Sequence, residues 1–382
     1  MLFKSGTVGI ISGFAVLTLS ASNSFATEPT NTQQNTIHSP APAVTYPLPS
    51  SQQPPQPLPS QSGTTTLGAT STYTTTTTDV LAETAIPYGS YQTDVSSFKR
   101  DLESTADIEN AMNMLGTHNA QRLASGWLAY SALLAAQSEN FRKGVEDTDA
   151  YHGRERLLNG MRNSPAYTLS LAGAEDAMSR ALGAGKADAR RLDIAGEQVK
   201  QQAYTLQSLG WAKARLSGRP TDHANQIRTA ATTGRPQAGN IRSIFLSPDV
   251  DTTISSANAL AGTTSLWDRL SQQPAGVGFQ QPIPVNRGFQ SRPRQYTIRG
   301  EREVSAGNIA TLAALKILGE TQARTAFVSS ALEDQQTQAC FNQAQLNLLQ
   351  CVSASRNVFE RPFCIGVHAL KEIGECIGDV SY

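Results

Sequence analysis

The sequence predicts an all-α protein: an irregular multi-helix bundle with a disulfide-stapled C-terminal helical hairpin, preceded by a disordered Pro/Thr-rich segment. Apolar residues recur at helical spacing through most of residues 91–382, and all four cysteines lie near the C-terminus. Charged residues are only 16% of the 382-residue chain, and Lys+Arg and Asp+Glu both number 31. This balance excludes a protein that binds nucleic acid through a uniformly basic surface.

Residues 1–26 are typical of a secretory signal peptide. Lys4 precedes the apolar stretch 8–19, and Ser24 and Ala26 place small residues at a cleavage site. The apolar stretch is too short to span a bilayer as an anchor. We therefore expect export to the periplasm or cell surface, with no membrane span in the mature chain.

Residues 27–90 are predicted to form a disordered spacer. Nine of the 19 prolines lie between Pro29 and Pro59, and ten threonines lie between Thr64 and Thr78. Such a segment buries too little apolar surface to offset an ordering cost of about 1–2 kcal/mol per residue. A solvated tether, a segment that docks on a partner, and a glycosylated segment all stay open.

The helical domain is predicted over residues 91–272, and its clearest helix lies between His118 and Lys143. A shorter helix over 107–115 precedes it and stops at Gly116. Seven residues of the main helix follow one another at intervals of three and four, which places them on one face. These residues are Ala120, Leu123, Trp127, Tyr130, Leu134, Gln137 and Phe141.

A second group of helices follows Ser164-Pro165, a pair that favours a helix start. We expect that helix to end near Gly183, and Gly185 to separate it from a longer helix over 187–216. The longer helix has a coiled-coil-like seam, because Leu192, Val199 and Leu206 recur every seven residues. Further helices are expected at 221–232, 249–271, 304–318 and 321–355.

A Pro/Gly/Arg-rich loop is predicted over residues 273–303, with a short strand at 296–299. Its arginines suit an anion-binding patch, because guanidinium groups bind phosphate and carboxylate well. A solvated loop is the other reading. The five arginines are Arg287, Arg292, Arg294, Arg299 and Arg302.

The four cysteines predict two nested disulfides in the C-terminal helical segment, residues 304–382. Cys340 and Cys351 are 11 residues apart, about 16 Å along a helix, which exceeds the reach of a disulfide. In an antiparallel hairpin the numbers of facing residues have a nearly constant sum, which pairs Cys340 with Cys376 and Cys351 with Cys364. The hairpin then turns near residue 358. The spacings fit neither a zinc site nor a redox Cys-x-x-Cys motif.

No motif identifies a reaction or a cofactor. Ser96-x-x-Lys99 and Gly183-x-Gly185-Lys186 match fragments of known motifs whose other parts are missing. The nearest approach to a metal-ligand cluster is Asp147, Asp149, His152 and Glu155. Glu139, Asp147 and Glu155 are the candidate carboxylates for glycan hydrolysis, and each also suits a solvated helix face.

The function expected from these observations is that of a non-enzymatic, exported cell-envelope protein. It would be a structural or interaction module that presents a helical body on a flexible tether. Its partner would be another envelope protein or a cell-wall polymer, and not nucleic acid. Two alternatives stay open: an exported cell-wall glycan hydrolase with a carboxylate pair, and an anion or small-molecule binder that uses the 287–302 arginine segment.

Overall fold

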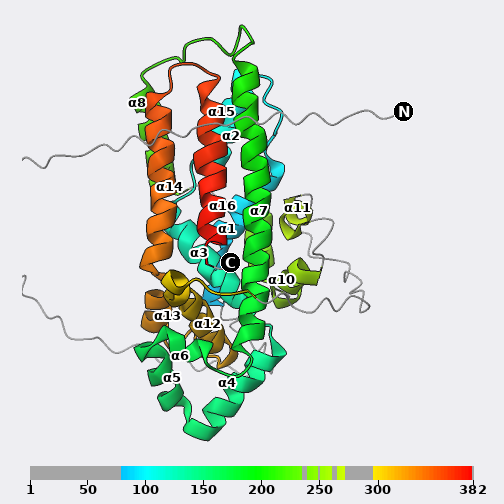
Figure 1. Ribbon diagram of the computed structural model, residues 1–382, viewed down its shortest axis with the longest axis vertical. Coiled ribbons are helices and arrows are strands. Elements are labelled where there is room, and N and C mark those ends of the chain that lie inside the picture. Colours follow the sequence, from blue (N-terminus) through cyan, green and yellow to red (C-terminus); the bar gives the residue numbers. More distant parts are fainter. Residues whose placement is uncertain (1–78, 235–238, 248–249, 260–264, 272–295, 381–382) are drawn as a thin grey trace, which may run out of the picture. The chain divides into compact units, whose positions relative to one another are not determined.

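The computed structural model describes residues 79–380, with gaps at 235–238, 248–249, 260–264 and 272–295. The predicted signal peptide and most of the predicted spacer lie outside these residues. Within them all regular structure is helical, which confirms the all-α prediction (Figure 1). The helices are α1 (Val80–Ser97), α2 (Thr105–Leu115), α3 (Ala120–Ala135), α4 (Glu139–His152), α5 (Arg154–Asn163), α6 (Pro165–Leu169), α7 (Ala174–Leu206), α8 (Pro220–Thr233), α9 (Gly239–Phe245), α10 (Val250–Ala259), α11 (Leu266–Ser271), η1 (Gly300–Arg302), α12 (Glu303–Ile317), α13 (Thr325–Leu332), α14 (Gln335–Ala354), α15 (Glu360–Cys364), η2 (Ile365–Lys371) and α16 (Glu372–Gly378).

Helix α1 corrects the predicted end of the spacer. Its cap Asp79 accepts a hydrogen bond from the backbone N–H of Leu81, and the helix continues through Pro87. Leu81, Ile86 and Tyr88 are fully buried. Residues 80–90 therefore belong to the folded body, because their apolar side chains pack against α3. Pro87 and Gly89 both lie inside this helix.

Helix α3 is buried along almost its whole length between α1, α7, α12 and α14. The helix predicted between 118 and 143 is in fact two helices, α3 and α4. The break falls at residues 136–138, where the Ser138 hydroxyl caps α4 by accepting from the backbone N–H of Phe141 at 3.1 Å. The predicted apolar face survives the break, because Phe141 is fully buried.

Helix α7 is continuous where a break was predicted. Gly183 and Gly185 lie inside its 33 residues, and it ends at Leu206 instead of continuing to residue 216. Figure 1 shows α7 beside α15 and α16, and α14 on the other side of these two helices. At the contact with η2, a Cβ on Gly196 would come within 2.5 Å of the Gly366 carbonyl oxygen. Any side chain larger than hydrogen at position 196 would therefore push α7 and η2 apart.

Other predicted helices are also divided. Among the described residues of 249–271, helices α10 and α11 are separate and Ser265 is outside both, and residues 321–355 contain α13 and α14. Asp334 caps α14 by accepting from the backbone N–H of Thr337 at 2.8 Å, and this cap marks the second break. Residues 296–299 form no strand; the backbone N–H of Arg299 donates to the Val380 carbonyl instead.

The C-terminal helical hairpin is confirmed. Its first rod is α14, and its second rod is the run of α15, η2 and α16. The outer disulfide joins Cys340 and Cys376, with Cα atoms 5.7 Å apart, and the inner disulfide joins Cys351 and Cys364, at 5.6 Å. The hairpin turn, residues 355–359, lies between the rods as predicted. No described helix is long and apolar enough to span a membrane.

Candidate functional site

The predicted arginine patch lies mostly outside the described residues. Arg287, Arg292 and Arg294 are not described, so their role as an anion site stays a prediction. Arg299 forms an ion pair with Asp379 at 3.2 Å. Arg302 is buried, and its Nη2 donates to the Thr337 hydroxyl at 3.3 Å. These two arginines therefore hold parts of the fold together.

The candidate carboxylates lie exposed on α4 and α5. Glu139 and Asp147 are exposed on α4, and Glu155 is exposed on α5, where it pairs with Arg324. Asp149, from the candidate metal cluster, instead forms a bidentate ion pair with Arg154. Among the described residues, no group of three or more His, Cys, Asp or Glu side chains could hold a metal ion.

The two motif fragments have structural roles. The Ser96 hydroxyl accepts from Arg191 at 2.9 Å, while Lys99 pairs with Glu103 at 2.8 Å and with Asp107 at 3.1 Å. The serine and the lysine therefore belong to different networks. The Gly183-x-Gly185-Lys186 fragment lies within α7 and cannot form a phosphate-binding loop there.

A buried polar network joins α1, α7 and α11. The Asp188 carboxylate accepts from the Tyr88 hydroxyl at 2.7 Å and from the Trp267 indole at 2.8 Å. Gln92 donates to Tyr88 at 2.8 Å, and Arg191 in turn donates to Gln92. Burial raises the pKa of Asp188, and Arg191 and the two donors oppose that shift. With its carboxylate oxygens held by donors from two helices, the network stabilises helix packing.

Two histidines that are far apart in the sequence meet at a small cavity of about 20 Å³. His118 Nε2 lies 2.8 Å from Asp94 Oδ2, and His368 Nδ1 lies 2.8 Å from Glu372 Oε1. A space of this size holds about one water molecule. We therefore assign the cavity to packing and not to ligand binding.

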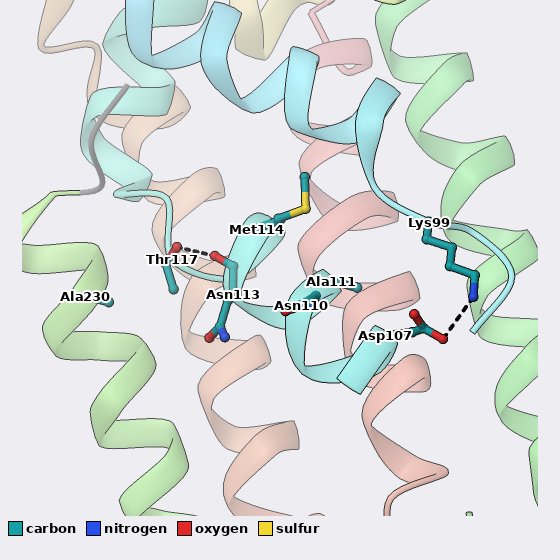
Figure 2. A pocket seen from close by; sticks show the side chains of 8 residues that line it. All are labelled: Lys99, Asp107, Asn110, Ala111, Asn113, Met114, Thr117 and Ala230. Atoms are coloured by element: carbon teal, nitrogen blue, oxygen red, sulfur yellow. Dashed lines mark hydrogen bonds and ion pairs between the residues drawn. The ribbon is translucent and has the colours of Figure 1, made fainter. Parts of the chain in front are cut away.

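Two hollows lie beside α2. The first is a groove of about 590 Å³ that is lined mainly by residues of α2. Figure 2 shows the Lys99–Asp107 ion pair at one end and Ala230 of α8 at the other. Asn113, Thr117 and Ala230 also line a second hollow, so the two hollows adjoin.

The second hollow is the Arg361 pocket, with a volume of about 390 Å³. Four segments that are distant in the sequence form its walls: α2, the residues before α8, α8 itself, and the hairpin turn with α15. Its apolar lining includes Ile108, Ile227 and Val358, all of which are buried. Small-molecule sites are typically pockets of about this volume with mostly apolar walls and a few polar groups.

Arg361 is one of seven polar residues among the thirteen that line this pocket. The residue is 6% exposed, and neither Nε nor Nη2 has a hydrogen-bond partner. Burial lowers the pKa of Arg361, and the nearby charges of Glu109 and Glu360 act in the opposite direction. An arginine keeps its charge in proteins even so. Arg361 is therefore a charged group whose Nε and Nη2 are shielded from solvent and have no hydrogen-bond partner.

The fold fixes the position of Arg361 through its neighbours in the chain. The inner disulfide closes a loop of 13 residues around the hairpin turn. Backbone N–H groups of Val358 and Phe359 donate to the carbonyls of Ala214 and Ala212, each at 3.1 Å. The turn is therefore tied to the segment that follows α7, and Arg361 is placed by rigid elements on both sides.

The sequence offered one signal for this site. The cysteine pairing placed a turn near residue 358, and Val358 is one of the residues that line the pocket. It did not indicate that α2 and α8 lie against that turn. Comparison with known proteins gives no match to a family model, to a curated protein or to a solved structure.

Proposed function

We propose that the chain is an exported, non-enzymatic protein of the cell envelope, a structural or interaction module that presents its helical body to another envelope protein or a cell-wall polymer. The observation that carries the proposal is the pair of nested disulfides, which uses all four cysteines. Structural disulfides are typical of exported proteins, because the cytosol keeps thiols reduced. The signal peptide predicted over residues 1–26 agrees with this location.

Support for a non-enzymatic role comes from the structural roles of side chains that could otherwise take part in catalysis. Ser96, Asp188 and Arg191 hold α1, α7 and α11 together through one buried network. The carboxylates considered for glycan hydrolysis lie exposed on α4 and α5. A hydrolytic carboxyl group normally needs a shielded site that keeps it protonated at neutral pH.

The export proposal is tested by expressing the full chain in a bacterium with two membranes. We expect the protein in the periplasm or at the cell surface, with residue 27 at its N-terminus and without thiols that alkylating reagents can reach. Recovery from the cytoplasm with four alkylated cysteines would overturn the proposal.

The hydrolase alternative is tested on purified cell wall. We expect the purified, oxidised protein to release no soluble glycan fragments. Release that is lost in Glu139→Gln, Asp147→Asn or Glu155→Gln would replace the non-enzymatic proposal with the hydrolase. Release that survives in all three variants would also contradict it.

A further inference from the structure

One end of the helical body is formed by two loops that are far apart in the sequence. They are the segment between α7 and α8, residues 207–219, and the hairpin turn, residues 355–359, and Figure 1 shows both at the end where α7 and α14 finish. Three backbone hydrogen bonds of 3.0–3.1 Å join the loops, and Arg215 and Asn357 form an antiparallel bridge. We call these two loops together the basic tip.

The basic tip concentrates positive charge in a chain that is neutral as a whole. Lysine plus arginine and aspartate plus glutamate both number 31, yet residues 207–219 contain Lys213, Arg215 and Arg219 and no acidic residue. The hairpin turn adds Arg356 and again no acidic residue. A surface that gathers one sign of charge attracts a partner of the opposite sign.

Three of these four cations are not used by the fold. Arg219 is held in an ion pair with the aspartate three residues later. Lys213, Arg215 and Arg356 are exposed, and within the described part of the chain their side chains form no hydrogen bond or ion pair. The carboxylate that follows the turn, Glu360, accepts from two backbone N–H groups instead. Three positive charges are therefore available to a partner.

Apolar side chains lie beside these cations in the sequence. Leu209 is 40% exposed, and Tyr204, in the last turn of α7, is 51% exposed. Trp211 packs partly against the core and is also partly exposed. The ring of Tyr204 contacts Phe363 of α15 edge to face, with centroids 6.5 Å apart. The basic tip thus presents leucine and aromatic surface together with unpaired cations.

This combination favours a surface of anionic lipid over a hydrated polyanion. Each Lys or Arg close to an anionic bilayer raises the affinity about fivefold. Leucine and tryptophan gain further by entering the boundary between headgroups and acyl chains, where the amphipathic indole ring is well accommodated. A hydrated polyanion would neutralise the cations but leave Leu209 and Trp211 in water.

We propose that the basic tip docks the protein on an anionic lipid surface, with Lys213, Arg215 and Arg356 on the headgroups and Leu209 and Trp211 at the acyl-chain boundary. The inner disulfide and the backbone hydrogen bonds hold the two loops together, so docking requires no rearrangement of the helices. The inference goes beyond the proposed function, because it identifies a surface and the chemistry that this surface recognises.

The first test is flotation of the purified, oxidised full chain with lipid vesicles in a density gradient. We expect the protein to float with vesicles of equal parts phosphatidylglycerol and phosphatidylcholine. Affinity for vesicles of phosphatidylcholine alone should be about 100-fold lower, because three cations lose their partners. Any contribution from the apolar stretch 8–19 is common to all variants and to both kinds of vesicle.

The second test uses tryptophan fluorescence as a local probe of the basic tip. The chain has three tryptophans, and Trp127 and Trp267 are each 1% exposed, so only Trp211 can meet lipid. We expect phosphatidylcholine with brominated acyl chains, mixed into the anionic vesicles, to quench the fluorescence of the bound protein. Trp211→Phe should remove this quenching, while the variant still floats with the vesicles.

Two triple variants separate the basic tip from a general charge effect. The tip variant, Lys213→Gln/Arg215→Gln/Arg356→Gln, should bind the anionic vesicles about 100-fold more weakly. The control variant removes three exposed cations of α4 and α5 and should bind as the wild-type protein does. Its substitutions are Lys143→Gln, Arg156→Gln and Arg162→Gln. Thermal unfolding followed by circular dichroism checks that each variant is folded.

Five results would overturn the proposal. They are the absence of flotation with anionic vesicles, equal affinity for the two kinds of vesicle, bound protein without quenching by brominated lipid, unchanged binding of the tip variant, and tighter binding to soluble dextran sulfate than to the anionic vesicles. The last result would replace the lipid surface with a hydrated polyanion. Each can occur while the disulfides, the location of the protein and its lack of hydrolytic activity stay as proposed.

Discussion

Replacing Arg361 with methionine should make the protein more stable, although the residue lies in the folded body. The side chain is 6% exposed, and its Nε and Nη2 are buried without partners. Each unsatisfied buried donor costs about 1–3 kcal/mol. Methionine keeps an unbranched apolar stem of similar length and removes both donors and the charge.

The gain is reduced by what the arginine contributes. Attraction to Glu109 and Glu360 is partly screened by solvent, and such pairs contribute about 0–1 kcal/mol each. Two donors at about 1–3 kcal/mol each, less about 0–1 kcal/mol for each of the two pairs, give an expected stabilisation by Arg361→Met of about 0–6 kcal/mol, centred near 3 kcal/mol. For a domain of this size, each kcal/mol raises the Tm by about 2 °C, so the central value corresponds to a shift of about 6 °C.

The assay is urea unfolding followed by far-UV circular dichroism. A loss of more than about 1 kcal/mol in the variant would refute the reasoning. It would mean that Arg361 has a structural partner in solution.

Three further predictions concern the scaffold. Replacing the outer disulfide with two alanines should lower the free energy of unfolding by about 4 kcal/mol and replacing the inner one by about 3 kcal/mol, from their loops of 36 and 13 residues. Equal losses for the two disulfides in urea unfolding would contradict this dependence on loop length. Gly196→Ala should cost about 1–3 kcal/mol in urea unfolding, because the new Cβ would meet a carbonyl oxygen at 2.5 Å, while Gly210→Ala, which has open space, should cost far less. Asp188→Asn should cost about 1–3 kcal/mol at neutral pH, because Tyr88 and Trp267 donate to different carboxylate oxygens, and the amide NH2 that replaces one oxygen would face a donor. Burial raises the pKa of Asp188, so the native state binds its proton more tightly than the unfolded state does. The wild-type protein should therefore lose stability as the pH rises from the ordinary aspartate range through the raised value, and a pH series in which Asp188→Asn shows the same slope would refute this assignment.

The sequence best predicted the features that depend on the regular geometry of a helix or a hairpin. The pairing of Cys340 with Cys376 and of Cys351 with Cys364 follows from helix rise and hairpin symmetry alone, and the structure confirms it. The apolar face of residues 120–141 was also correct. Both inferences use a period within one helix or one hairpin, so they need no knowledge of other parts of the chain.

The predicted helix boundaries were wrong where tertiary contacts outweighed the local sequence pattern. The breaks at Ser138 and Asp334 lie inside apolar patterns, and the capping side chains alone mark them. In contrast, Gly183 and Gly185 did not end α7, because the surrounding helices hold that segment in place. The Arg361 pocket could not be predicted, because its four walls are joined only by tertiary packing.

The placement of Arg361 has a consequence for the order in which the protein matures. One wall of its pocket is near the start of the folded body, and the arginine itself is near the end of the chain. A polypeptide that emerges N-terminus first, from a ribosome or from a translocation channel, lacks this pocket until α15 has emerged. The pocket is complete once α15 packs beside α2 and the cysteines form their disulfides. Every incomplete or truncated product would thus lack the pocket altogether.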